Sequence, residues 1–450
     1  MRTTSRHRDR AQGELYAANG AGHLSRAGRN SRVAAPDLAL GRRTLIAYRQ
    51  GMPSADAVDD WTTDYDILDD DYVADPYTVW ADLRGQCPIA HTDRWGGSWL
   101  PTRYADVAAI AHDVEHFSSR DVGVLSFTAE ERPPPPIDIP LPPIDADPPV
   151  HTWTRRLLLP WFSHTRVDGY EKFTRDLCNR LIDGFIDSGS ADAAQDYAQQ
   201  IPVRVIALTL GVPSEMSDTF TGWVRDVLEF AHDEVRSTAG RDNIVAYLVG
   251  ELAKRRVDAG DDLISELLHT EVDGEPVPDL QVMGMAALTL IAGVDTTWSA
   301  IGSAMLHLAS NPDDAQRLIN EPELMPTGIE ELLRAYSPVT MARIAVDDIE
   351  VGGCPIQAGD KVLMNFPGAN RDPEAFDRAD EVMLDRANNR HVAFGVGIHR
   401  CAGSNLARME LRVAIEEWLR RIPSFTLADN AEVTWAGGQV RGPRTVPVTF

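Results

Sequence analysis

The ten residues from 394 to 403 read Phe394-Gly395-Val396-Gly397-Ile398-His399-Arg400-Cys401-Ala402-Gly403. One cysteine thus lies in a glycine-punctuated loop, and a helix-forming run over residues 405–421 follows at once. Glycines let a backbone turn tightly and approach a flat ligand closely, and the N-terminus of a helix favours an anionic sulfur. The stretch predicts that Cys401 is a metal ligand. The alternative is a glycine-rich turn that holds an incidental buried cysteine.

The composition is that of an ordinary globular enzyme, but its charge is unevenly spread. The chain has 450 residues, of which 43% are hydrophobic and 25% are charged. Its net charge is −25, yet residues 1–50 hold ten arginines and three acidic residues, so the remainder carries about −32. A body this acidic repels phosphate backbones, which argues against nucleic acid as a partner.

The cysteines indicate neither a disulfide framework nor a zinc site. Cys87, Cys178, Cys354 and Cys401 are scattered, with no Cys-x-x-Cys and no zinc-like Cys/His spacing. A reducing cytoplasm is the simplest setting for four such thiols. We expect Cys87, Cys178 and Cys354 to be small buried apolar side chains.

No segment has the features of a membrane anchor or a secretory signal. The longest apolar candidate, residues 282–294, is shorter than the ~18 residues that a span needs and ends at Asp295, so it is predicted to be a core helix. The first 50 residues lack the apolar middle of a secretory signal; they are rich in arginine and weakly resemble a mitochondrial transit peptide. We expect residues 1–60 to be a disordered basic extension, or the product of translation begun upstream of the usual start, ahead of a domain over residues 61–450.

The periodicity predicts a mainly α chain that folds as one large domain with small β-sheets. Helical patterns dominate from residue 151 onward; they include about 151–167 and 312–320, and the longest covers residues 279–310. Short strand-like pieces occur at 343–346, 349–351, 361–364, 432–435 and 446–450. Residues 120–149 are rich in proline, which predicts an extended loop, and a loop this long inside a domain is usually functional.

A weak turn interrupts the longest predicted helix. Residues 292–297 read Ala-Gly-Val-Asp-Thr-Thr, and glycine and consecutive threonines are poor choices for a helix interior. An acid, Asp295, beside an alcohol, Thr296, suits proton delivery. The alternative is an ordinary helix in which Asp295 forms a buried salt bridge.

Two further pairs of side chains have helical spacing. Glu331 and Arg334 stand at i and i+3, and by themselves they would be a solvated surface pair of little energetic value. His151 and Arg155 stand at i and i+4, so both can reach one anion.

Taken together, these segments resemble the cytochrome P450 family over residues 61–450. The Cys401 loop matches its haem-binding pattern, and residues 292–296 match its oxygen-activation signature about 105 residues earlier. The resemblance implies the P450 fold and haem b, with Cys401 as the axial ligand and Asp295 and Thr296 as the proton-delivering pair. It also implies a buried network of Glu331, Arg334 and Arg386. The partners it implies for the haem propionates are His151, Arg155, Arg343 and His399.

The resemblance implies a haem-thiolate monooxygenase, since a thiolate ligand favours O–O cleavage. Electrons would come from a separate ferredoxin or flavodoxin-type donor with its reductase, because no flavin or iron–sulfur domain fits in this length. The substrates would be O2 and a medium-sized hydrophobic molecule, and the setting the cytoplasm. A peroxide-driven peroxygenase and a non-catalytic haem protein are the alternatives. The expected substrate lining is the proline-rich loop, 227–235, Leu288, Ile291, 339–342 and the turn 437–439.

Arginines gather in the two segments expected to flank the cysteine side of the haem. They are Arg155, Arg156, Arg400, Arg408 and Arg412. A basic patch on an acidic body would steer a small acidic ferredoxin to that face. The alternative is that some of them form ion pairs with Glu410, Glu416 or Glu417.

Overall fold

The computed structural model describes residues 57–127 and 139–450, which all belong to one compact unit. Most of the predicted extension 1–60 and the middle of the proline-rich loop, 128–138, lie outside the described residues. The domain boundary near residue 60 therefore stays a prediction.

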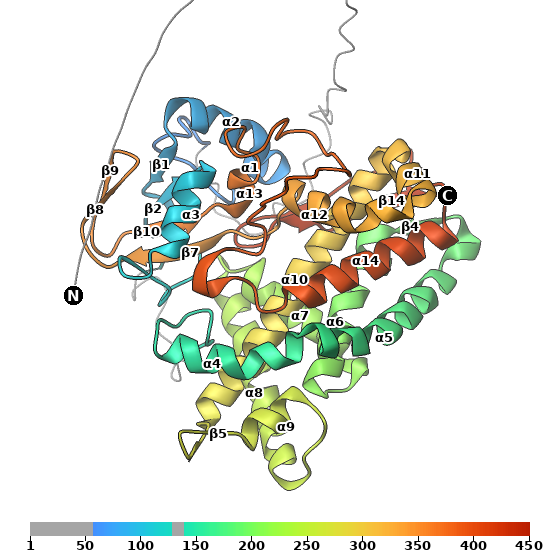
Figure 1. The fold of residues 1–450 in the computed structure, drawn as a ribbon, viewed down its shortest axis with the longest axis horizontal. Coiled ribbons are helices and arrows are strands. Elements are labelled where there is room, and N and C mark those ends of the chain that lie inside the picture. Colours follow the sequence, from blue (N-terminus) through green and yellow to red (C-terminus); the bar gives the residue numbers. More distant parts are fainter. Residues whose placement is uncertain (1–56, 128–138) are drawn as a thin grey trace, which may run out of the picture. The chain divides into compact units, whose positions relative to one another are not determined.

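Helices make up most of the described chain, as Figure 1 shows. Their bounds are α1 (Asp70–Ala74), α2 (Pro76–Gln86), α3 (Tyr104–His112), α4 (Val150–Leu158), α5 (His164–Asp183), α6 (Gln200–Leu210), α7 (Ser217–Leu228), α8 (Glu234–Val257), α9 (Leu263–Leu268), α10 (Asp279–Ser310), α11 (Pro312–Asn320), α12 (Met325–Ala335), α13 (Phe366–Ala369) and α14 (Ser404–Arg421).

The strands form small sheets. The largest has the order β1 (Ile89–Thr92), β2 (Ser98–Pro101), β10 (Lys361–Met364), β7 (Met341–Ala345) and β3 (Phe117–Ser118), with β10 parallel to β2 and the other pairs antiparallel. A second sheet joins β11 (Thr426–Leu427), β14 (Pro447–Thr449) and β4 (Ser190–Asp192). Three hairpins complete the set: β5 (Glu271–Val272) with β6 (Glu275–Pro276), β8 (Ile349–Val351) with β9 (Cys354–Ile356), and β12 (Trp435–Ala436) with β13 (Gly442–Pro443).

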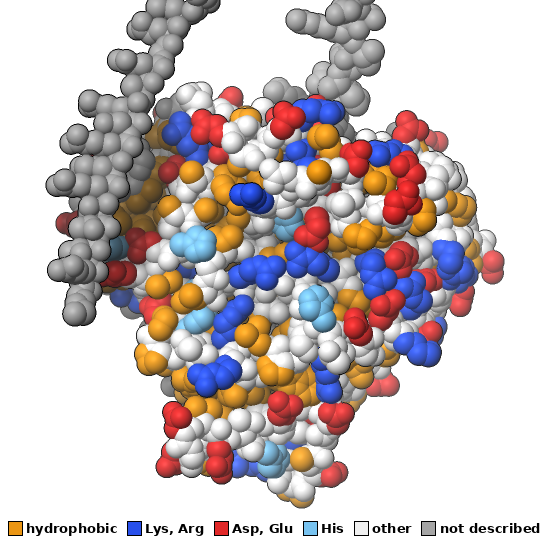
Figure 2. All heavy atoms as spheres, in the orientation of Figure 1, with side chains coloured by type: hydrophobic (Ala, Val, Ile, Leu, Met, Phe, Trp, Pro, Cys, Tyr) orange, Lys and Arg blue, Asp and Glu red, His pale blue; other side chains and the backbone are white. Residues whose placement is uncertain are grey.

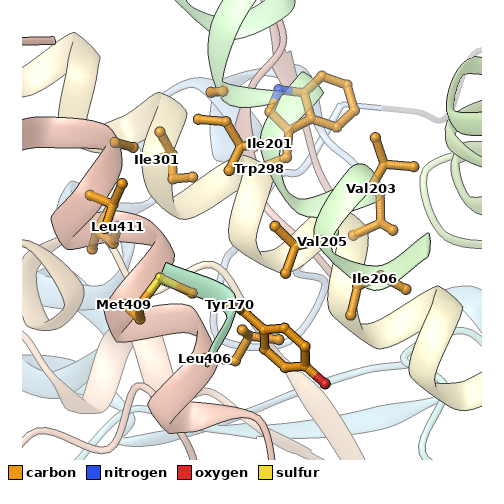
Figure 3. Close-up of a cluster of buried hydrophobic side chains, with 14 of the residues drawn as sticks. Tyr170, Ile201, Val203, Val205, Ile206, Trp298, Ile301, Leu406, Met409 and Leu411 are labelled. Atoms are coloured by element: carbon orange, nitrogen blue, oxygen red, sulfur yellow. The ribbon is translucent and has the colours of Figure 1, made fainter. Parts of the chain in front are cut away.

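Helix α10 is the centre of the hydrophobic core and contacts α6, α7, α8 and α14. Figure 3 shows part of this core, to which Ile206 on α6, Trp298 on α10 and Met409 on α14 all belong. Each such side chain contributes about 1.5–3 kcal/mol when it is removed from water. Helix α10 is also long and apolar enough to cross a membrane, but 67% of its most apolar window is buried inside the protein, as in a core helix.

One predicted helix was wrong in its extent. The periodicity placed a single helix over 151–167, whereas α4 ends at Leu158, a 3-10 turn covers Leu159–Phe162 and α5 begins at His164. Pro160 lies in that turn, and its missing N–H and fixed φ prevent an α-helix from continuing.

The prediction for the cysteines was wrong in two cases. Cys178 is buried as expected, but Cys87 and Cys354 are only half-buried. Both of their thiols lie near the carbonyl oxygen of Ile89, at 3.3 and 3.8 Å. They occupy the border between α2 and the β8–β9 hairpin instead of the core.

Candidate active site

The cysteine loop is held by its own backbone. The Cys401 N–H donates to the Phe394 carbonyl at 2.7 Å, and Gly395 and Gly397 adopt positive φ of 65° and 73°. A Cβ atom at position 397 would approach the Ala111 carbonyl oxygen to 2.6 Å, so a larger residue would push the loop away from α3. The loop then leads into α14 at Ser404, which fixes the position of Cys401 relative to that helix.

Cys401 is the one exposed cysteine among the chain's four, all of which the structure describes. Protein nevertheless surrounds its sulfur densely enough that burial raises the pKa of the thiol. The Gly403 N–H and the charges of Arg155, Arg400 and Arg408 act in the opposite direction. The hydrogen bond from the backbone just before α14 therefore lowers the pKa of the Cys401 thiol as expected, but burial raises this pKa by more. A bound metal ion would be needed to hold the sulfur as a thiolate.

Two histidines from distant segments meet beside the loop. The ring centroids of His151 on α4 and His399 lie 4.4 Å apart. His151 Nε2 lies 3.1 Å from the Ile398 carbonyl, and His399 Nε2 lies 2.9 Å from Ser119 Oγ. Burial, followed by the charges of nearby cations, lowers the pKa of His399 to about 3, so this ring is neutral at ordinary pH.

Two arginines join these histidines. Arg343 on β7 is 6% exposed, and its guanidinium donates to the Ala342 carbonyl at 2.7 Å, with no carboxylate of a described residue within 4.0 Å. Burial lowers the pKa of Arg343 to about 10. Arg155 on α4 donates to the Arg400 carbonyl. The structure thus brings together two arginines and two histidines that can all bind an anion.

One face of α10 is less buried than the rest of the helix. Leu288, Ala292, Thr296 and Ala300, spaced four apart, are half-buried, whereas most of their neighbours along the helix are buried. The Thr296 hydroxyl donates to the Ala292 carbonyl at 2.8 Å. The hydroxyl thus bonds to the carbonyl one turn earlier, and α10 continues through this turn as one unbroken α-helix, Asp279–Ser310, so the predicted interruption is not seen.

Asp295 lies on a different face of α10 and is bound to an arginine. Its Oδ1 accepts a hydrogen bond from Arg444 Nη2 at 2.8 Å, in an ion pair whose side chains are 1% and 5% exposed. Burial raises the pKa of Asp295, and the charge of Arg444 lowers it. The alternative that the sequence left open, a buried salt bridge at Asp295, is therefore present in the structure.

The Glu331 network is buried at the end of α12. Arg334 donates to both oxygens of Glu331 at 2.8 Å and to the carbonyls of Asn370, Ala379 and Glu381. Arg386 Nε donates to Glu331 Oε2 at 2.9 Å. The structure thus brings the three predicted residues together and excludes the reading of a solvated surface pair.

Two of the expected substrate-lining segments meet. The Thr340 N–H donates to the Gln439 carbonyl at 3.0 Å, and Gln439 Nε2 lies 3.3 Å from the Met341 sulfur. Residues 339–342 therefore lie against residues 437–439. Leu288 and Ile291 are half-buried on α10.

Comparison with known proteins identifies the family. The cytochrome P450 family model matches residues 192–427. The chain is 36% identical over 355 residues to a probable cytochrome P450 127A1 of Sinorhizobium fredii, covering 79% of this chain and 84% of that protein. The chain belongs to the cytochrome P450 family.

Two further relatives agree with this assignment. The chain is 34% identical to the mycinamicin IV hydroxylase/epoxidase of Micromonospora griseorubida, covering 78% of this chain and 89% of that protein. The solved structure of the polyketide synthase cytochrome P450 PksS of Bacillus subtilis superposes with a TM-score of 0.77 at 28% identity, covering 86% and 99% of the two chains. The protein is a bacterial-type P450, a haem-thiolate monooxygenase that binds haem b and oxidises a hydrophobic organic substrate.

The residues around Cys401 are suited to binding haem b. A haem b needs one axial ligand for its iron and cationic partners for its two carboxylates. Cys401 offers an accessible thiol, and Arg343 offers a buried guanidinium without a carboxylate partner among the described residues. A buried charge of this kind is stable only when an anion pairs with it.

Several residues of the site lie outside any recognisable sequence pattern. Arg444 and Glu229 flank Asp295, yet they lie 149 and 66 positions away along the chain. Ser119, which contacts His399, lies in the proline-rich segment without a motif of its own. Only a general expectation, that a buried carboxylate needs a cation, could have prompted a search for Arg444.

Proposed function

We propose that Cys401 is the axial ligand and that Asp295 and Thr296 deliver the protons for oxygen activation. The bound haem supplies the chemistry that activates O2 and oxidises a C–H bond. The observation that carries the proposal is the accessible Cys401 thiol beside the cluster of Arg343, His399, His151 and Arg155.

The proton path begins on α10. Thr296 has a hydroxyl on the half-buried face, and Asp295 is its neighbour in sequence. To pass a proton, the Thr296 hydroxyl must leave the Ala292 carbonyl, and Asp295 must turn toward it.

The cationic cluster would hold the two carboxylates of the cofactor. Arg343 is rigidly placed because β7 pairs with β10 on one side and β3 on the other. His399 and His151 are fixed by Ser119 and the Ile398 carbonyl. Anion binding at this cluster would relieve the mutual repulsion of its cations.

Three further parts of the proposal concern the electron donor, the cellular compartment and the substrate. We propose a ferredoxin or flavodoxin-type donor with its reductase, a cytoplasmic setting, and a medium-sized hydrophobic substrate. The half-buried Leu288, Ile291 and Met341 support an apolar substrate. The relatives named for mycinamicin IV and for polyketide biosynthesis make a polyketide-type molecule the first one to test.

The experiment compares absorption spectra and turnover. Cys401→Ala should abolish the carbon monoxide band that is distinctive of thiolate ligation, whereas Cys178→Ala should keep it. Thr296→Ala should consume reductant and oxygen yet release more hydrogen peroxide, and Asp295→Asn should slow turnover by about 10²-fold with unchanged substrate binding. A thiolate band in the Cys401→Ala protein would refute the ligand. Full activity with peroxide alone would instead support the peroxygenase alternative.

A further inference from the structure

Two of the four cysteines are neither proposed iron ligands nor core residues. Cys401 is the proposed axial ligand, and Cys178 is completely buried, with a pKa that burial raises to about 12. Cys87 and Cys354 are both half-buried, so a small oxidant in solvent can reach their sulfurs. These two are the accessible thiols that remain free when Cys401 binds iron.

The thiols of Cys87 and Cys354 face the same backbone atom. Cys87 Sγ lies 3.3 Å and Cys354 Sγ lies 3.8 Å from the Ile89 carbonyl oxygen, so the two sulfurs are at most the sum of these distances, 7.1 Å, apart. Cys87 also acts on Cys354 through its charge, which follows burial as the largest cause that raises the pKa of Cys354. Two segments that are far apart in the chain therefore bring a pair of thiols together at Ile89.

The backbone holds each thiol at this position. Cys87 is the C-cap of α2, and its N–H donates to a carbonyl of the last helical turn at 2.8 Å. Cys354 begins β9 directly after Gly352 and Gly353, which adopt φ of 57° and 86°, as a tight two-residue hairpin turn requires. A Cβ atom at Gly352 would approach Ile89 Cδ1 to 2.9 Å, so the tip of the hairpin is packed against β1.

The hairpin is free to bring the two sulfurs into contact. Strands β8 and β9 pair with each other and with no further strand of the described chain. A disulfide needs its sulfurs about 2.05 Å apart, so the thiols must turn from the Ile89 carbonyl toward each other. Because no ladder of hydrogen bonds fixes β9 to β1 in the described chain, the hairpin can shift together with its thiol.

We propose that Cys87 and Cys354 are an oxidation site, at which hydrogen peroxide forms a reversible disulfide that fixes the β8–β9 hairpin beside β1. A monooxygenase is itself a source of this oxidant, because O2 that is reduced by two electrons without oxidation of the substrate leaves as hydrogen peroxide. In a reducing compartment such a bond is transient and responds to oxidative conditions. The inference rests on the proposed function in one respect, the binding of Cys401 to iron, which Cys401→Ala tests separately.

One molecule of hydrogen peroxide balances the oxidation. Burial raises the pKa of Cys354, so this thiol keeps its proton and Cys87 attacks first, as a thiolate. Cys87 Sγ breaks the O–O bond and becomes a sulfenic acid, and the released hydroxide joins the proton that Cys87 lost to form water. Cys354 Sγ then attacks the Cys87 sulfur, the S–O bond breaks, and the leaving hydroxide takes the proton of Cys354 as a second water. The two sulfurs lose the two electrons that peroxide accepts, and a dithiol reverses the change.

The first test maps the disulfide in the holoenzyme. Reduced holoenzyme is treated with hydrogen peroxide at a dose that leaves its carbon monoxide band unchanged. The remaining thiols are then alkylated, and the peptides are analysed by mass spectrometry with and without dithiothreitol. A peptide pair linked through Cys87 and Cys354 should form with peroxide and disappear on reduction. Absence of this pair, or linkage of either thiol to Cys178 or Cys401 instead, would overturn the inference.

The second test separates the roles of the two thiols. In Cys354→Ser the sulfenic acid at Cys87 has no thiol to resolve it, so a 1,3-diketone probe for sulfenic acids should label Cys87 after peroxide. In Cys87→Ser the same probe should leave Cys354 unlabelled. Cys178→Ser is the matched control and should form the same linked pair as the wild type, because its thiol is buried. Labelling of Cys354 as strong as that of Cys87 would overturn the order of attack.

The third test measures the hairpin itself. Amide hydrogen exchange of residues 349–356 should slow in the peroxide-treated holoenzyme and recover after dithiothreitol, because the bond ties β9 to the segment that leads into β1 and restricts local opening. Cys354→Ser, which cannot form the bond, should show no such change. Slowing of the same size in Cys354→Ser would assign the effect to another oxidation. Unchanged exchange in cross-linked wild type would show that the bond does not fix the hairpin, and either result would overturn the proposed effect on β8 and β9.

Discussion

The contribution of an ion pair to the stability of this protein depends on how deeply the pair is buried. Glu331 and Arg334 are both completely buried, and Glu331 also accepts from Arg386. Glu331→Gln leaves two buried guanidinium groups without their carboxylate, so the free energy of unfolding should fall by about 3–5 kcal/mol. Urea unfolding of the holoenzyme measures this loss. The exposed pair of Arg378 and Glu381 is the control, and Glu381→Gln should barely change stability. Equal effects from the two variants would contradict the argument.

A partly buried carboxylate predicts the response to acid. The hydrogen bonds and charges of Arg408 and His391 outweigh burial and lower the pKa of Glu330 from 4.5 to about 2. A depressed pKa in the folded state stabilises the protein above the unfolded pKa, and this stabilisation is lost as pH falls from about 4.5 toward 2. Thermal unfolding across that window should therefore depend less on pH in Glu330→Gln than in the wild type. Parallel pH profiles would show that Glu330 does not carry the effect.

At the scale of residues, local patterns were predictable and long-range partners were not. The spacing of Glu331 and Arg334 predicts that they share a helix face, but burial depends on residues 370–386, which fold over them. Asp295 was identified from the turn that contains it, whereas its partner Arg444 comes from the end of the chain. The spacing of residues in the sequence predicts which side chains are neighbours within one helix or strand. It does not predict contacts between elements that are far apart in the chain.

At the scale of elements, the contact between α10 and the proline-rich loop is very close. A Cβ atom at Gly284 would overlap the backbone carbonyl of Pro140, which cannot rotate away. Gly284→Ala should therefore displace residues 139–143, lower the free energy of unfolding by about 1–3 kcal/mol and weaken substrate-induced spectral shifts. At Gly293 the overlap is with the end of the Ile206 side chain, which can move, so Gly293→Ala should have a smaller effect. Denaturant titration of both variants tests this order, and a larger loss in Gly293→Ala would contradict it.

Regular elements were predicted best where the pattern was long and its ends were marked. The predicted bounds of α10, α11, β8 and β10 agree with the structure, because prolines and turn residues flank these segments. The two-residue strand β3 and the three-residue strand β4 were missed, since so short a segment has no periodicity. Strand β4 exists because it pairs with β14, and β3 because it pairs with β7.

At the scale of the whole molecule, basic side chains gather on one face although the net charge of the protein is negative. The chain carries a net charge of −25, yet Figure 2 shows lysine and arginine side chains gathered over the middle of the face that bears α4, the Cys401 loop and α14. Two of the arginines expected there are already paired: Arg408 with Glu330, and Arg412 with Glu171 and Glu416. Arg156 and Arg400 are exposed and have no acidic partner within 4.0 Å among the described residues.

This distribution moves the proposed docking site of an acidic electron donor to Arg156 and Arg400. Steering by exposed charges acts on the association rate and weakens as salt screens the field. The double variant Arg156→Glu with Arg400→Glu should slow first-electron reduction by a ferredoxin and flatten its dependence on salt, while the carbon monoxide spectrum stays unchanged. Arg412→Gln is the matched control: because its guanidinium is occupied by Glu171 and Glu416, it should change stability more than the reduction rate. If Arg412→Gln slowed reduction and the double variant did not, the donor would dock through the paired arginines instead.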